Sequence, residues 1–296
     1  MKILGFQPKT PFHILSDCSK PTKEQRKYLQ KCKPMICTPI RGQTVQGNYH
    51  LSIQSVSKWG ALLGVNIDIQ MLMNCSYIEQ GRNVLANTFY NSDCTHLIFI
   101  DSDNGFVTNH FFELLLAQKD IVGGVYTKRK INWDAVHKAV LQGVPVEGLA
   151  HCAGDFPMHA LQDHEIKIGV EPQKVLTLPT GFLCISRKTF DTYVKAFPDR
   201  KTTPNSPGHY GIQFFQAGTF RSQNEQGEIV VGFDSEDNVF CKDMLTLGIN
   251  TYVCPWMQIS HHGEYLFDSC FACSNGAYVH FAGWHERQEK VVNDRG

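Results

Sequence analysis

The fold is decided by the run Thr95-His96-Leu97-Ile98-Phe99-Ile100-Asp101-Ser102-Asp103-Asn104-Gly105. Its first part ends in four consecutive apolar residues, a pattern typical of a central parallel strand that is covered on both faces. Two aspartates then follow in a polar turn. In an open α/β sheet, ligands bind outside the carboxyl ends of the strands. The run therefore predicts a buried strand that leads directly into a binding site.

Strand and helix patterns alternate on both sides of this run. Before it, hydrophobic periodicity predicts helices over 23–31, 47–63 and 80–90 and strands over 35–37 and 67–73. After it, the patterns predict a helix near 111–118, strands at 120–126, 181–186 and 251–254, and a helix through 242–247, with a long polar insertion over 128–174. This alternation favours the α/β class, with a single Rossmann-like domain on a mostly parallel central sheet.

Composition supports one folded body with an unusual first segment. The 296 residues are 42% hydrophobic and 19% charged, which suffices for one large α/β domain. The formal net charge is zero, so no global charge requires a nucleic acid or an acidic surface as partner. Residues 1–41 nevertheless hold nine Lys and Arg against two acids, which we interpret as a solvated helix face. We expect a basic amino-terminal extension over 1–34, a main domain over 35–270 and a carboxyl-terminal tail over 271–296.

The cysteines and the apolar runs indicate a compartment. Eleven cysteines, an odd number, are scattered through apolar stretches, which suits buried reduced thiols better than a disulfide framework. The pair Cys270 and Cys273 is a weak redox or metal signal without a second pair. The first residues lack the apolar core of a secretory signal, and no run approaches the ~20 apolar residues that span a bilayer. We therefore expect a cytoplasmic protein, in the host cytoplasm if it is viral, with no membrane partner.

The two acids of the central run indicate a metal site. Asp101 and Asp103 are one residue apart and lie in a turn beyond a strand, so both can approach one hard divalent cation, directly or through water. A cation there would bridge the two phosphates of a nucleotide-sugar and stabilise the departing diphosphate. Acid pairs of this kind are more often structural in turns, but the preceding strand makes this context specific.

The order of further motifs resembles that of the GT-A glycosyltransferases, particularly bacterial and viral members in which a strand ends in Leu-Ile-Phe-Ile-Asp-x-Asp. The likeness extends from about Ile36 to Phe267. It implies a GT-A domain that uses Mn²⁺ or Mg²⁺ and a nucleotide-sugar donor, with a UDP-sugar expected by family habit. A late His-x-Gly, here His261-His262-Gly263, would return to the metal and make His261 a ligand beside Asp101 and Asp103, although His262 is an alternative.

The same resemblance assigns the remaining site residues. Thr38 and Pro39 would cradle the nucleobase and ribose, Arg82 and Asn83 would lie near a phosphate, and Ser102 and Lys128 would also contact the donor. Acceptor binding would fall to Thr180, Gly181 and Phe182, where small residues let the backbone approach a sugar. Glu236 and Asp237 would face the acceptor. The basic run over 128–130 is suited to phosphate contact, but we interpret it as a solvated loop.

The chemistry of the residues agrees with this assignment. Sugar transfer needs a base on the acceptor hydroxyl, and Asp237 or Glu236 could take that proton, although both could instead cap a helix after Ser235. An acidic base would make the reaction inverting. The acceptor could be a hydroxymethylated DNA base, as in phage DNA modification, or a glycan. A sugar-phosphate nucleotidyltransferase and a non-catalytic sugar- or nucleic-acid-binding protein of the same fold remain alternatives.

Overall fold

A computed structural model describes residues 20–161, 166–167, 169–202, 211–223 and 226–264. The chain divides into one compact unit over Met1–His262 and a second over Gly263–Gly296, of which only the first two residues are described. The predicted tail over 271–296 and the pair Cys270 and Cys273 lie outside the described residues. So does most of the predicted basic extension, whose helix is present as α1 Lys23–Leu29.

Seven strands form the central sheet, in the order β2-β1-β3-β7-β5-β10-β6. Their bounds are β1 Pro34–Pro39, β2 Asp68–Leu72, β3 His96–Ile100, β5 Ile121–Gly123, β6 Gln173–Val175, β7 Phe182–Ser186 and β10 Thr251–Val253. Strand β1 is parallel to β2 and β3, and β10 is parallel to β5, whereas β7 and β6 run antiparallel to their neighbours. Five strands thus share one direction, and the predicted mixed α/β fold with a mostly parallel central sheet is confirmed.

The central strand differs from the prediction in one respect. Strand β3 is fully buried from Leu97 to Ile100, as expected, but only its β1 side is parallel. On the other side β7 is antiparallel, with Leu97 opposite Ile185 and Ile100 opposite Phe182. The start of β7 therefore lies beside the end of β3, which places residue 181 next to the acidic turn.

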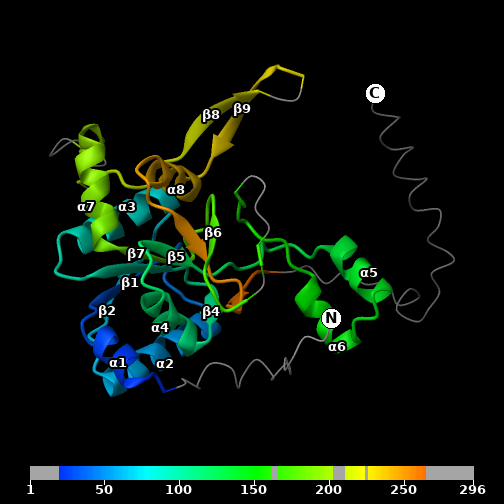
Figure 1. Cartoon of the computed structure of the whole chain (residues 1–296), viewed down its shortest axis with the longest axis horizontal. Helices are drawn as coiled ribbons and strands as arrows, with labels where there is room; N and C mark the ends of the chain where they lie inside the picture. Colours follow the sequence, from blue (N-terminus) through cyan, green and yellow to red (C-terminus); the bar gives the residue numbers. More distant parts are fainter. Residues whose placement is uncertain (1–19, 162–165, 168, 203–210, 224–225, 265–296) are drawn as a thin grey trace. The chain divides into compact units, whose positions relative to one another are not determined.

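Helices cover both faces of the sheet (Figure 1). One group contains α1 Lys23–Leu29, α2 Gly47–Leu63 and α4 Thr108–Leu116, and the other contains α3 Ile78–Tyr90, α7 Arg187–Ala196 and α8 Glu236–Thr246. Along β3 the side chains alternate between the two groups: Leu97 and Phe99 pack with the second group, Ile98 and Ile100 with the first. The continuous apolar run is explained by this double cover.

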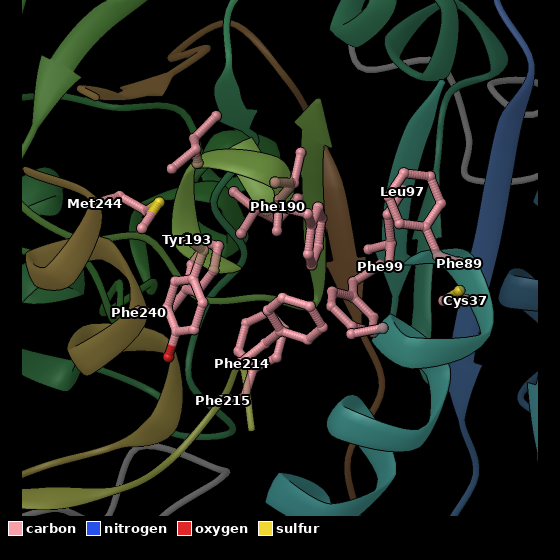
Figure 2. Packing of buried hydrophobic residues seen from close by; sticks show 14 of the residues in the cluster. Cys37, Phe89, Leu97, Phe99, Phe190, Tyr193, Phe214, Phe215, Phe240 and Met244 are labelled. Atoms are coloured by element: carbon pink, nitrogen blue, oxygen red, sulfur yellow. The ribbon is translucent and has the colours of Figure 1, made fainter. Parts of the chain in front are cut away.

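Aromatic rings fill the layer between the sheet and the second group (Figure 2). The ring of Phe190 lies 5.1 Å from that of Phe89, 4.9 Å from that of Phe214 and 6.2 Å from that of Phe240, measured between centroids. All four side chains are fully buried. Such pairs add to the free energy gained from burying the rings.

The predicted helices and strands are present within a few residues, but several elements are new. The polar insertion over 128–174 contains α5 Trp133–Leu141, α6 Val146–Leu149, a 3₁₀ turn over Ala150–Cys152 and β6. Helix α7 was not predicted. Neither was the hairpin of β8 Gly218–Gln223 and β9 Ile229–Asp234.

A small second sheet joins the acidic turn to the end of the unit. Strand β4 Asn104–Phe106 pairs antiparallel with β11 Ile259–His261, so that Asn104 is opposite His261. Gly105 is needed here, because a Cβ at this position would lie 2.7 Å from Asn48 Cβ and 2.7 Å from Ser260 Oγ. This pairing brings residues separated by more than 150 positions to one place.

The cysteines of the described residues agree with the expectation of buried thiols. All eight are free thiols, most of them buried. None of the helices in the described residues is long and apolar enough to cross a bilayer.

The aromatic layer leads to a stability prediction. Replacing Phe190 by Ala should lower the free energy of unfolding by about 3–5 kcal/mol, because it leaves a cavity among three rings. The same substitution at Phe233, which is 70% exposed, should change it by less than about 0.5 kcal/mol. Urea unfolding of both variants measures the difference, and an equal effect at the two positions would contradict this packing.

Candidate functional site

The acidic turn after β3 forms part of the wall of a cleft of about 280 Å³. Asp101, Ser102 and Asp103 line it together with the last residue of β1 and residues that follow β1, β2 and β5, namely Pro39, Arg41, Cys75, Ser76, Ile78 and Arg129. The cleft therefore lies at the carboxyl ends of parallel strands, where α/β sheets bind ligands. Its charged lining consists of two arginines and two aspartates.

Asp101 is held from the interior by a buried cation. Arg82, on α3, donates from Nη2 to Asp101 Oδ1 at 2.8 Å and from Nε to Glu236 Oε1 at 3.3 Å. Its side chain is 3% exposed and its guanidinium lies 4.9 Å from the centre of the Phe99 ring. Burial raises the pKa of Glu236, and the charge of Arg82 opposes that rise. Arg82 thus ties the acidic turn to the first turn of α8.

Asp103 faces both a guanidinium and an imidazole. Its Oδ2 forms an ion pair with Arg129 Nη2 and lies 3.6 Å from His261 Nε2. The other ring nitrogen, His261 Nδ1, lies 2.6 Å from the Thr127 carbonyl oxygen. A carbonyl can only accept, so Nδ1 carries the proton and Nε2 of the neutral ring presents a lone pair. Burial lowers the pKa of His261, which favours this neutral form.

The Asp103 and His261 pair fits a divalent cation. One ion with bonds of about 2.1 Å can join atoms up to about 4.2 Å apart, and the observed separation is 3.6 Å. Carboxylate and imidazole donors suit Mn²⁺, and a backbone carbonyl behind the imidazole is the usual support of a metal ligand. The position of His261, predicted from the late His-x-Gly, is therefore favourable.

The predicted three-residue metal site is not preassembled. No group of three His, Cys, Asp or Glu side chains in the described ranges could hold a metal ion. The physical reason is that Asp101 already binds Arg82, whereas Asp103 and His261 face each other. Two protein ligands nevertheless suffice where substrate phosphates and water complete the coordination, as is common for Mg²⁺.

The predicted nucleotide residues have different surroundings. Pro39 and Ser102 line the cleft, but Thr38 is fully buried and its hydroxyl lies 2.7 Å from that of Tyr49. Thr38 thus holds the end of β1 against α2 through this hydrogen bond. Arg41, which follows it, supplies a charge on the cleft wall.

The helix that precedes the acidic turn supplies supports as well. Asn83 is fully buried, and its amide donates to the Phe215 carbonyl at 2.6 Å and accepts from the Phe215 N–H at 2.9 Å. Asn83 thus holds an interior loop in this structure, and its predicted contact with the donor stays a prediction. Arg82 is occupied by two carboxylates, and the exposed Lys128 pairs with Asp155 at 2.9 Å.

The predicted acceptor turn is buried and packs against the acidic turn. Thr180, Gly181 and Phe182 are each almost completely inaccessible. The Gly181 carbonyl accepts from the Asp101 N–H at 3.0 Å and from the Asn104 amide at 2.9 Å. The Gly181 N–H donates to the Tyr126 hydroxyl at 3.2 Å. Their role in this structure is to position the acidic turn, and direct acceptor contact is left as a prediction.

The two acids of α8 have different environments. Glu236 is 9% exposed and paired with Arg82, whereas Asp237 is half-buried and accepts from the Ser235 hydroxyl and the Asn238 N–H. Ser235 is the N-cap residue, yet its own side chain makes no capping hydrogen bond. Asp237 nevertheless accepts a backbone N–H in the first turn of α8, so helix capping stays an alternative for this acid.

Sequence reasoning did not assign Arg129 to the site. The basic run over 128–130 was interpreted as a solvated loop, and its middle residue lies on the cleft wall beside Asp103. Arg129 Nε also donates to the His262 carbonyl at 3.1 Å. The three adjacent cations of this run are suited to phosphate contact, but nothing in the sequence distinguishes the middle one from its neighbours.

Comparisons with known proteins do not identify the family. No family model matches the chain, and no curated protein matches it. Among solved structures, the chain is similar to a nucleoside-diphosphate-sugar pyrophosphorylase from Vibrio cholerae RC9. The identity is 15% over 85% of this chain and 81% of that chain, with a TM-score of 0.31. A similarity at this level does not distinguish between functions, and the resemblance to GT-A glycosyltransferases stays a prediction.

The crowding at Gly181 leads to a second prediction. An added Cβ would clash with the Tyr126 hydroxyl and lie 2.6 Å from Asp101 Oδ2. Gly181→Ala should therefore lower the free energy of unfolding by about 1–3 kcal/mol. Gly47→Ala is the matched control, since nothing lies within 4 Å of its added Cβ. Chemical denaturation of both variants tests this. If the free energy of unfolding of Gly181→Ala equals that of the wild-type protein, Gly181 is not packed against Tyr126 and Asp101 as described.

Proposed function

We propose that the chain is a metal-dependent glycosyltransferase that transfers a sugar from a nucleotide diphosphate to an acceptor hydroxyl. The observation that carries the proposal is the pair of facing donors, Asp103 Oδ2 and His261 Nε2, 3.6 Å apart beside a cleft at the carboxyl ends of the strands. Two protein donors leave coordination positions for a diphosphate.

The donor would bind along the cleft wall. Pro39 and Ile78 offer apolar surface to a base, while Arg41 and Arg129 offer charge to phosphates. Asp103 and His261 would hold Mn²⁺ or Mg²⁺, and a bound cation neutralises the charge that develops on the departing diphosphate. The preference for a uridine nucleotide comes from the sequence resemblance.

Asp237 is the better candidate for the base. Glu236 is buried against Arg82, so its carboxylate is already engaged, whereas Asp237 is more accessible. Asp237 would accept the proton of the acceptor hydroxyl while that oxygen bonds to the anomeric carbon and the bond to the diphosphate breaks. Attack opposite the leaving group inverts the anomeric configuration.

The acceptor is a hydroxymethylated DNA base or a glycan in this proposal. DNA binding would depend steeply on salt concentration, because protein cations release counterions from the phosphates. A duplex target would also have to expose its base by flipping. Binding of modified DNA and of glycans at increasing salt therefore separates the two acceptor classes.

The decisive experiment is UDP release from UDP-sugars in the presence of Mn²⁺. We expect slow UDP release by the purified protein and its loss by at least about a hundredfold in Asp103→Asn, because a ligand of the charge-stabilising cation is weakened. Asp93→Asn is the matched control, since Asp93 is 79% exposed and pairs with Lys33 on the surface.

The outcomes separate the alternatives. Formation of pyrophosphate with a sugar phosphate would indicate a nucleotidyltransferase, and acceptor binding without turnover or metal dependence would indicate a non-catalytic binding protein. Full activity of Asp103→Asn would rule out the proposed metal site.

The base is tested by a second pair of variants. Asp237→Asn should lower kcat by about 10²–10⁴-fold with little change in the affinity for UDP and Mn²⁺, because only proton transfer is removed. Glu236→Gln should instead disturb the Arg82 network and lower stability. Steady-state kinetics and nucleotide titrations measure both effects. If kcat falls in Glu236→Gln alone, the assignment of the two acids is reversed.

A further inference from the structure

The Arg129 guanidinium lies beside Asp103 and His261, the two side chains proposed to hold the divalent cation. Its Nη2 pairs with the same Asp103 oxygen that faces His261 Nε2, and its Nε is held by the His262 carbonyl at 3.1 Å. The carboxylate oxygen and the imidazole lone pair would repel each other without positive charge nearby. In this structure the guanidinium supplies that charge.

Each aspartate of the cleft faces a guanidinium. Asp101 is compensated by Arg82, and Asp103 by Arg129. The two ion pairs differ in burial, because the Arg82 side chain is 3% exposed and the Arg129 side chain 55%. Breaking the Arg82 pair would leave a buried guanidinium without its partner, so Arg82 is fixed. The Arg129 guanidinium is half-exposed, so it can leave Asp103 and remain in contact with water.

The backbone beside Arg129 keeps it near the cleft after such a move. The Lys128 N–H donates to the Asp155 carbonyl at 2.7 Å, and the Thr127 carbonyl lies against His261 Nδ1 at 2.6 Å. A guanidinium released from Asp103 would thus remain beside the cation and would meet the phosphates that the cation carries. Its planar fork suits phosphate oxygens.

We infer that Arg129 exchanges partners: it occupies the cation position at Asp103 in the nucleotide-free protein and moves to the diphosphate when the divalent cation arrives with the nucleotide. The inference rests on the proposed function and adds a diphosphate-binding residue to it. It also implies an order of binding, since the cation alone must compete with a guanidinium, whereas the cation with its nucleotide gives that guanidinium a new partner.

The test measures two affinities that this exchange moves in opposite directions. Mn²⁺ binding without nucleotide is followed by electron paramagnetic resonance, and UDP binding at saturating Mn²⁺ by calorimetry. In Arg129→Ala, Mn²⁺ alone should bind about fivefold more tightly, the scale of a partly exposed ion pair, and UDP about fivefold more weakly. Arg129→Gln should behave in the same way, which guards against a folding defect in one variant.

Lys130→Ala is the matched control, because it removes the same charge from an exposed neighbour in the same loop. It should change both affinities much less than Arg129→Ala does. An unchanged Mn²⁺ affinity in both Arg129 variants, an effect equal to that of Lys130→Ala, or weaker binding of both ligands would overturn the exchange.

Failure of the exchange and failure of the proposed function are distinguishable. If the wild-type protein binds Mn²⁺ and UDP and releases UDP from a UDP-sugar, only the Arg129 result decides the exchange. If the wild-type protein binds no UDP with Mn²⁺ and releases none, the proposed function fails and the exchange falls with it.

Discussion

The site depends on one buried charge, the guanidinium of Arg82. A buried arginine is tolerated only when its charge is compensated, and Arg82 lies beside Asp101, Glu236 and the face of Phe99. Its Nη1 has no hydrogen-bond partner in the described part of the chain. Phe99 lies on β3, Asp101 in the turn after it and Glu236 on α8, so one guanidinium contacts both elements. Removing either carboxylate would leave one more N–H of this buried guanidinium without its acceptor.

The sheet supplies the second constraint, through the reversed strand β7. Only an antiparallel strand can bring its first residues beside the last residues of β3, and this is how the Gly181 carbonyl reaches the Asp101 N–H. The pairing of β4 with β11 does the same for His261. The acidic turn is therefore fixed from below by Gly181, from one side by Arg82 and from another by the His261 strand. Its geometry is set by backbone pairing as well as by charge.

Much of the fold could be predicted from the sequence, because local patterns carry that information. The helix over Gly47–Leu63 has the predicted bounds, and the apolar run of β3 marked a buried strand whose end lies at a cleft. The direction of β7 could not be predicted, since Phe182-Leu183-Cys184 is apolar in either direction. The hairpin of β8 and β9 was missed because its outer residues, such as Phe233, are exposed and show no one-sided alternation.

In the candidate site, too, the sequence predicts some features, and others depend on how the chain folds. The sequence indicated Asp103 and His261 as neighbours because motif order predicted both, but it could not show that Asp101 is engaged by Arg82. Nor could it rank Glu236 against Asp237, which are adjacent in the sequence. They differ only in direction: in the first turn of α8, successive side chains point about 100° apart, so one carboxylate meets the buried Arg82 and the next stays accessible. A single helical step thus separates a carboxylate paired with a buried arginine from an accessible one, and this difference arises only because α3 places Arg82 beside the first turn of α8.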